Sequence, residues 1–240
     1  MKRLDISKYG LFIFDWDGAL ADSLGTYREL DKLFVKEFYG VERPVADFYE
    51  MSSRIKTGAV NGSENDYYRY LDGLFGDGKT SLELIWENIY KLAPKVQATI
   101  DYKLQADLAL KELRARTTAP IALATSSGIK DILFFSSNES ATAKKLRPMD
   151  YFDKIVTFDD VANPKPHPES FEKVISYYRV APEKTLIFED SLSGAQAAKT
   201  AGADVAIIYD KHSDKDRAEI EELMDYYFEK WQDFIKSIQE

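Results

Sequence analysis

Residues 12–23 read FIFDWDGALADS. This stretch begins with an apolar run typical of a buried strand, and it then places Asp15 and Asp17 two residues apart, directly before Gly18. Aspartate is disfavoured in strands, and two carboxylates this close repel each other. Taken alone, the pattern fits a functional site, a calcium loop or an acidic turn, so the rest of the chain must decide between them.

The composition is that of an ordinary globular protein. The chain has 240 residues, of which 45% are hydrophobic and 30% are charged, which is enough for one large domain or two small ones. A formal net charge of −9 argues against a nucleic-acid partner held by its phosphates. No window approaches the roughly 18 apolar residues of a membrane span. We therefore expect a cytoplasmic protein, a monomer or weak dimer, with neither nucleic-acid nor membrane partners.

Cysteine and histidine usage excludes several kinds of chemistry. The chain has no cysteine, which rules out disulfides, thiolate catalysis and cysteine zinc sites. Its only two histidines are His167 and His212, which argues against a histidine-rich metal centre or a Ser-His-Asp triad. Catalysis or binding by carboxylates, hydroxyls and lysine amines is not excluded.

Strand-like and helix-like segments alternate along most of the chain. Near-continuous apolar runs indicate strands buried on both faces, as in a parallel sheet. Four clear runs and a weaker fifth each end at polar residues: 9–15, 120–127, 153–160, 185–191 and 203–210. Helical patterns lie between them, at 104–116, 168–180 and 193–202. This alternation predicts a doubly wound α/β domain, in which ligands bind at the carboxyl ends of the strands.

Two regions depart from the alternation. Residues 23–94 show no convincing strand and are helical and rich in aromatic residues, so we expect a helical domain inserted into an α/β core of residues 1–22 and 95–240. The aromatic residues of this insertion are expected to form its core. Residues 220–238 have helical periodicity, and their aromatic side chains are expected to dock on the sheet.

Polar residues follow the predicted strands and would meet at one edge of the sheet. Each of these residues, taken alone, has an ordinary structural role: a threonine–serine run often caps a helix, and a lysine is usually solvated. Because each of them follows a strand of the same predicted sheet, the set as a whole indicates a functional site. Carboxylates gathered there suit Mg²⁺, and a lysine with hydroxyls suits a phosphoryl group. The set comprises Asp15, Asp17, Thr125, Ser126, Ser127, Lys165, Glu189 and Asp190.

Four stretches carry a resemblance to a known family: DWDGALADS, ALATSSG, NPKPHPESF and LIFEDSLSGAQAAKTAG. Their order and spacing resemble the haloacid dehalogenase superfamily, in the branch with a helical cap inserted after the first motif. That branch includes phosphoglycolate-phosphatase-like and beta-phosphoglucomutase-like proteins. The resemblance covers essentially the whole chain and is least constrained in the cap.

The resemblance implies a role for each motif residue. Asp15 would be the nucleophile that becomes an aspartyl phosphate, and Asp17 the general acid and base. Lys165 would neutralise charge on Asp15 and the phosphate. Mg²⁺ would be held by Asp15, the backbone carbonyl of Asp17, and Asp190, with Glu189 as a direct or indirect ligand. Phosphate binding would fall to Thr125, Ser127 and the backbone N–H groups of Gly18 and Ser126.

The implied activity is Mg²⁺-dependent hydrolysis of small phosphorylated metabolites. A sugar-phosphate mutase and a non-catalytic phospho-ligand-binding module are the alternatives. Beta-phosphoglucomutases carry a histidine in the linker beyond the first motif, whereas Tyr27 stands near that place here. Residues 51–60 are our candidate for a cap loop that faces substrate, in which Arg54 or Lys56 would contact an anionic or sugar substrate. Three departures from the family pattern are Ala19 for a threonine, Glu169 for an aspartate, and a long segment at 129–149.

Overall fold

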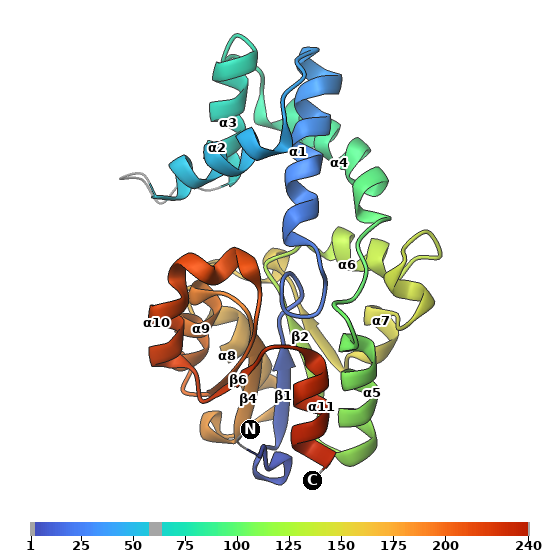
Figure 1. Ribbon diagram of the computed structural model, residues 1–240, viewed down its shortest axis with the longest axis vertical. Coiled ribbons are helices and arrows are strands. Elements are labelled where there is room, and N and C mark those ends of the chain that lie inside the picture. Colours follow the sequence, from blue (N-terminus) through green and yellow to red (C-terminus); the bar gives the residue numbers. More distant parts are fainter. Residues whose placement is uncertain (1–2, 58–63, 240) are drawn as a thin grey trace. The chain divides into compact units, whose positions relative to one another are not determined.

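The computed structural model describes residues 3–57 and 64–239, without the side chains of residues 53–57 and 64 (Figure 1). The chain divides into two compact units. Met1–Ser23 and Ile100–Glu240 form the first, which we call the α/β unit, and Leu24–Thr99 form the second, which we call the helical unit. No helix in the described ranges has both the length and the apolar character that a membrane crossing needs.

Within the described residues, one sheet of six parallel strands organises the α/β unit, in the order β3-β2-β1-β4-β5-β6. The central strands β1, β2 and β4 are buried along their whole length, which explains their continuous apolar sequences. The predicted doubly wound α/β fold is confirmed. The strands are β1 (Leu11–Phe14), β2 (Ile121–Ala124), β3 (Lys154–Val156), β4 (Thr185–Glu189), β5 (Asp204–Ile208) and β6 (Tyr226–Phe228).

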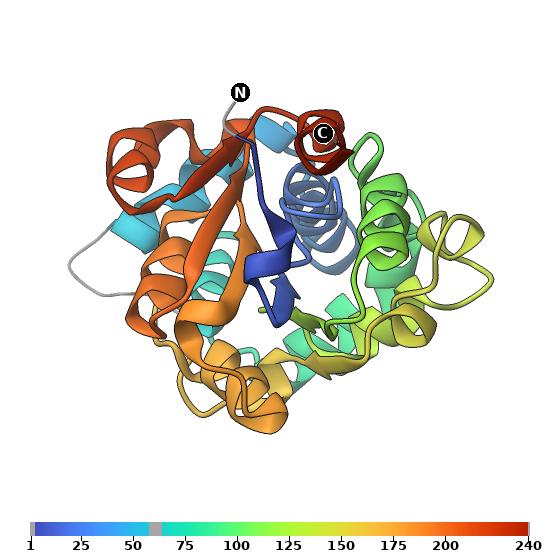
Figure 2. The same ribbon diagram turned by 90° about the horizontal axis from the view of Figure 1, so that it is seen from below.

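Helices cover both faces of this sheet (Figures 1 and 2). Helices α8 (Glu169–Tyr178), α9 (Leu192–Thr200) and α10 (Arg217–Leu223) lie on one side, and α5 (Ala106–Arg116) and α11 (Trp231–Gln239) lie on the other. The first side buries Ile13, Phe171 and Ala195 in one apolar cluster. The long segment at 129–149 forms α6 (Ile129–Phe135), a short 3-10 helix (Thr142–Lys144) and the start of α7 (Pro148–Tyr151).

The C-terminal region corrects one prediction. We expected a continuous helical pattern over residues 220–238, but α10 ends at Leu223 and β6 follows. Asp225 ends the helix because its backbone N–H donates to the Val205 carbonyl (2.9 Å) and its carboxylate accepts from the Val205 N–H (2.7 Å). These bonds align the next residues with β5. The expected docking of aromatic residues is confirmed, since the Trp231 ring packs 5.6 Å from that of Phe188.

The helical unit contains α1 (Leu24–Tyr39), α2 (Val45–Thr57), α3 (Glu64–Phe75) and α4 (Leu82–Gln97). Its aromatic residues contribute to the core, as expected: Phe34 and Phe48 are fully buried, together with the aliphatic Leu71 and Ile85. Helix α4 continues beyond residue 94, where we expected the helical segment to end.

The proposed cap loop at 51–60 is a second correction. Residues 51–57 belong to α2, because the sequence offers no glycine or proline to end the helix before Gly58. The remainder of that segment and the side chains of Arg54 and Lys56 lie outside the described part of the chain, so a substrate contact by Arg54 or Lys56 stays a prediction.

Candidate active site

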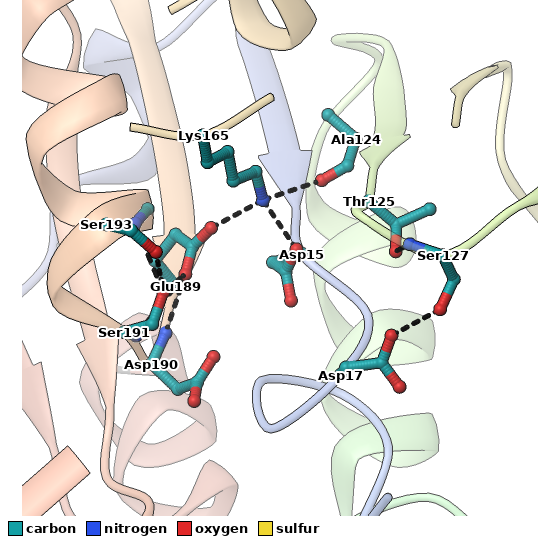
Figure 3. A network of polar contacts seen from close by, with 11 residues as sticks. Asp15, Asp17, Ala124, Thr125, Ser127, Lys165, Glu189, Asp190, Ser191 and Ser193 are labelled. Carbon is teal, nitrogen blue, oxygen red and sulfur yellow. Dashed lines mark hydrogen bonds and ion pairs between the residues drawn. The ribbon is translucent and has the colours of Figure 1, made fainter. Parts of the chain in front are cut away.

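The polar residues that follow the strands meet at the carboxyl edge of the sheet (Figure 3). Parallel register sets Phe14 of β1 opposite Leu123 of β2 and Phe188 of β4. Asp15 therefore leaves β1 at the level where β2 leads into Thr125 and β4 ends at Glu189. The Asp15 N–H still donates to the Phe188 carbonyl (2.9 Å), so the backbone that carries its carboxylate is fixed by the sheet.

Lys165 joins two of these strand ends. Its Nζ donates to Asp15 Oδ1 (2.5 Å), Glu189 Oε1 (2.6 Å) and the Ala124 carbonyl (3.1 Å). The lysine side chain is only 6% exposed. Burial would lower the pKa of Lys165, but Asp15 and Glu189 raise it above its ordinary value. Lys165 is therefore a fixed positive charge beside Asp15.

The loop before Lys165 is held by Glu169. The Glu169 carboxylate accepts from the N–H groups of Ala162 (3.0 Å) and Asn163 (2.9 Å) and pairs with Lys173 (2.9 Å). Sequence reasoning treated Glu169 as a mild departure from the family aspartate and missed this role. Its place at the start of α8, a few residues after the loop that contains Asn163, was the available signal.

Three buried carboxylates converge beside Lys165. Oxygens of Asp15, Glu189 and Asp190 lie within 4.8 Å of one another. Burial raises the pKa values of Asp15 and Asp190, and neighbouring carboxylates raise them further, although Lys165 acts against this at Asp15. One lysine does not balance three carboxylates, and hard oxygen donors suit a divalent cation such as Mg²⁺. The donor set therefore fits the predicted metal.

Glu189 differs from the other two carboxylates because both of its oxygens already have protein partners. Oε1 accepts from Lys165, and Oε2 accepts from Ser191 Oγ (3.1 Å) and the Asp190 N–H (3.1 Å). No hydrogen bond among the described residues ends on the carboxylate of Asp190. Asp15 and Asp190 are thus the carboxylates best placed to bind a cation, and Glu189 anchors the lysine.

Asp17 lies toward β2, on the other side of the site (Figure 3). Its Oδ1 accepts from Ser23 Oγ (2.6 Å) and its Oδ2 accepts from Ser127 Oγ (2.5 Å). The Ser127 N–H in turn donates to Thr125 Oγ1 (2.9 Å). Ser127 orients Asp17 here, and its predicted contact with phosphate stays a prediction. Ser23 was missed, although it closes the first motif.

Gly18 lies in the turn that follows Asp17, and its contact with phosphate stays a prediction. Its N–H donates to the Ala21 carbonyl (3.0 Å) in this tight turn. The turn places Gly18 at φ +83°, a conformation that favours glycine. Ala19, in place of the family threonine, is fully buried. Thr125, Ser126 and Lys165 do line one small cavity together, so the other predicted phosphate contacts are adjacent.

The comparisons now identify the family. A model of the haloacid dehalogenase-like hydrolase family matches residues 9–202. The chain belongs to this family. A phosphorylated carbohydrates phosphatase of Thermotoga maritima is 44% identical over 80 residues, which cover 32% of this chain and 37% of that protein. A fructose-1-phosphate phosphatase of Escherichia coli is 28% identical over 204 residues, covering 82% of this chain and 95% of the other.

Solved structures of the haloacid dehalogenase-like family agree with the fold. A Thermotoga maritima protein assigned as a beta-phosphoglucomutase has a TM-score of 0.75 and 25% identity, and covers 94% of this chain and 96% of the other. The predicted family resemblance is confirmed, and so is the predicted enzyme class, a phosphoric monoester hydrolase.

Proposed function

We propose that the protein is a Mg²⁺-dependent phosphatase that hydrolyses small phosphate monoesters through an aspartyl phosphate on Asp15. The observation that carries the proposal is Lys165, which contacts both Asp15 and Glu189 at the edge where Asp190 also lies. Burial and the neighbouring carboxylates raise the pKa of Asp15, whereas Lys165 favours its ionised form and a bound Mg²⁺ would favour it further, as attack on a phosphorus atom requires.

The residues divide the reaction into two steps. An oxygen of Asp15 forms a bond to phosphorus, the bond to the leaving oxygen breaks, and Asp17 gives that oxygen its proton. Asp17 then takes a proton from water, which attacks the same phosphorus and releases phosphate with Asp15 restored. Lys165 and the Thr125 hydroxyl face the negative charge that spreads over the phosphoryl oxygens.

Asp15, Asp190 and the Asp17 main-chain carbonyl would hold the metal. Mg²⁺, when bound, would supply positive charge that offsets the phosphoryl oxygens and the carboxylates around it. Glu189 keeps Lys165 in place in this arrangement. The buried excess of carboxylates over lysine supports the metal requirement.

The substrate class we propose is a phosphorylated sugar or a similar small metabolite, because two phosphatase relatives are named for such substrates. A sugar-phosphate mutase is the second candidate, and the structural likeness to the Thermotoga maritima protein favours it. The linker after the first motif has no histidine and carries Tyr27 near the place of the mutase histidine, which favours the phosphatase. We further propose that the protein is cytoplasmic and a monomer or weak dimer. It would have no nucleic-acid partner, because its net charge of −9 disfavours binding to phosphates.

One assay separates these functions. The purified protein is supplied with Mg²⁺ and a panel of sugar phosphates and other monoesters, and released phosphate is followed. A parallel reaction contains beta-glucose 1-phosphate with catalytic glucose 1,6-bisphosphate. We expect phosphate release from several esters and no net glucose 6-phosphate. Rapid glucose 6-phosphate formation with little free phosphate would establish the mutase, and binding without either product would establish the non-catalytic module.

A further inference from the structure

Three consecutive carbonyl groups of the loop after β1 are each bound by a donor from a distant part of the α/β unit. Lys103 Nζ donates to the Gly18 carbonyl (2.6 Å), and Trp231 Nε1 donates to the Ala19 carbonyl (3.0 Å). The Lys103 backbone N–H donates to the Leu20 carbonyl (2.8 Å). Lys103 therefore binds this loop twice, once through its backbone and once through its side chain.

The Lys103 ammonium is almost fully enclosed by acceptors. Besides the Gly18 carbonyl, it donates to the Tyr209 carbonyl (2.8 Å) and to Asp210 Oδ2 (2.8 Å), so all three of its N–H bonds are used. The side chains of Lys103 and Asp210 are 17% and 7% exposed. One charge thus connects the loop after β1 with the end of β5.

Stability alone does not account for this ion pair. A buried salt bridge gives little net stability compared with apolar side chains of the same volume, because both charges lose their hydration. The position of the pair is more informative. Gly18 directly follows Asp17, and Asp210 and Tyr209 line the same small cavity as Asp190. The pair therefore stands between the two segments that carry Asp17 and Asp190.

We infer that Lys103 is a positioning residue for the reaction at this site, an inference that rests on the proposed function. By fixing the Gly18 carbonyl, Lys103 sets the orientation of the turn that carries Asp17, whose main-chain carbonyl is a proposed metal ligand. Its charge also keeps Asp210 neutralised next to Asp190. Loss of the ammonium leaves the Gly18 carbonyl unpaired and frees the turn to reorient.

The backbone around Lys103 is held independently of its side chain. The Asp22 N–H donates to the Asp101 carbonyl (3.0 Å), and Ala21 pairs with Tyr102 in an antiparallel bridge. A substitution at residue 103 therefore tests the ammonium and leaves the neighbouring chain in place. Lys103→Met keeps most of the side-chain length, keeps the backbone bond to Leu20 and removes the charge.

The test compares wild type, Lys103→Met, Lys103→Arg and the control Lys111→Met, whose lysine pairs with Asp107 on the surface of α5. We measure kcat, KM, the Mg²⁺ concentration for half-maximal activity, and the Tm. In Lys103→Met we expect kcat to fall between about tenfold and a hundredfold with little change in KM. The Mg²⁺ requirement should rise, Lys103→Arg should recover part of the activity, and Lys111→Met should match wild type.

The outcomes separate the inference from the function on which it rests. An inactive wild type overturns the proposed function. An active wild type with unchanged kcat and Mg²⁺ requirement in folded Lys103→Met, whatever its Tm, overturns the role of Lys103. If Lys103→Met does not fold, Lys103→Gln replaces it, because it also removes the ammonium that binds the Gly18 carbonyl and Asp210. An unchanged kcat and Mg²⁺ requirement in Lys103→Gln also overturns the inference.

Discussion

A Cβ on Gly194 would lie 1.9 Å from the carboxyl carbon of Glu189. Gly194 belongs to the first turn of α9, and the Glu189 carboxylate packs directly against that turn. Only a residue without a side chain leaves room there for Glu189 to reach Lys165. The glycine therefore leaves the room that Glu189 needs to hold Lys165 beside Asp15.

Gly194→Ala should displace Glu189 and loosen Lys165. We expect kcat to fall at least about tenfold, because Lys165 then no longer stands fixed beside Asp15. The matched control is Gly73→Ala in α3, where an added Cβ meets nothing within 4 Å. That control should keep full activity and gain up to about 1 kcal/mol in helix stability. Full activity in Gly194→Ala would show that Lys165 does not depend on Glu189.

Asp15→Asn should abolish turnover without unfolding the protein. An amide is a poor nucleophile, so no aspartyl phosphate can form. Burial and the neighbouring carboxylates already disfavour the charged form of Asp15, as its raised pKa shows, so we expect no loss of Tm. Steady-state phosphate release and thermal unfolding measure the two effects. Near-normal release would refute the assigned nucleophile.

The sequence predicted those parts of the molecule that leave a local signal. Buried central strands such as β1 and β4 produce continuous apolar runs, and the motif order located Asp15 and Lys165 correctly at one sheet edge. Strand β6 was missed because three aromatic residues between two helices fit a helical period equally well. The contact of Lys103 with Gly18 joins residues 85 positions apart, and no local pattern reports such a bond.

Removing the metal should stop the reaction, and two carboxylate variants should respond differently. We expect Mg²⁺ to raise the Tm of wild type, because a cation offsets buried like charges, and excess chelator to abolish activity. Asp190→Asn should lose most of the Mg²⁺-induced rise in Tm. Glu189→Gln should keep most of that rise yet lose activity, since its oxygens bind Lys165 and Ser191. Full activity in excess chelator would exclude the metal role.

Glu169 should make stability depend on pH in the acid range. The N–H of Ala162, followed by Lys173, lowers the pKa of Glu169 from 4.5 to about 2. A lowered folded-state pKa stabilises the fold above the unfolded value, and this stabilisation is lost as pH falls from 4.5 toward 2. The amount by which the Tm of Glu169→Gln lies below that of wild type at the same pH should therefore be largest above about pH 5 and shrink steadily below about pH 4. Glu172→Gln, an exposed neighbour on α8, is the matched control and should show no such deficit. A deficit in Glu169→Gln that stays constant from pH 7 to about pH 3 would contradict the charge-dependent role of this carboxylate.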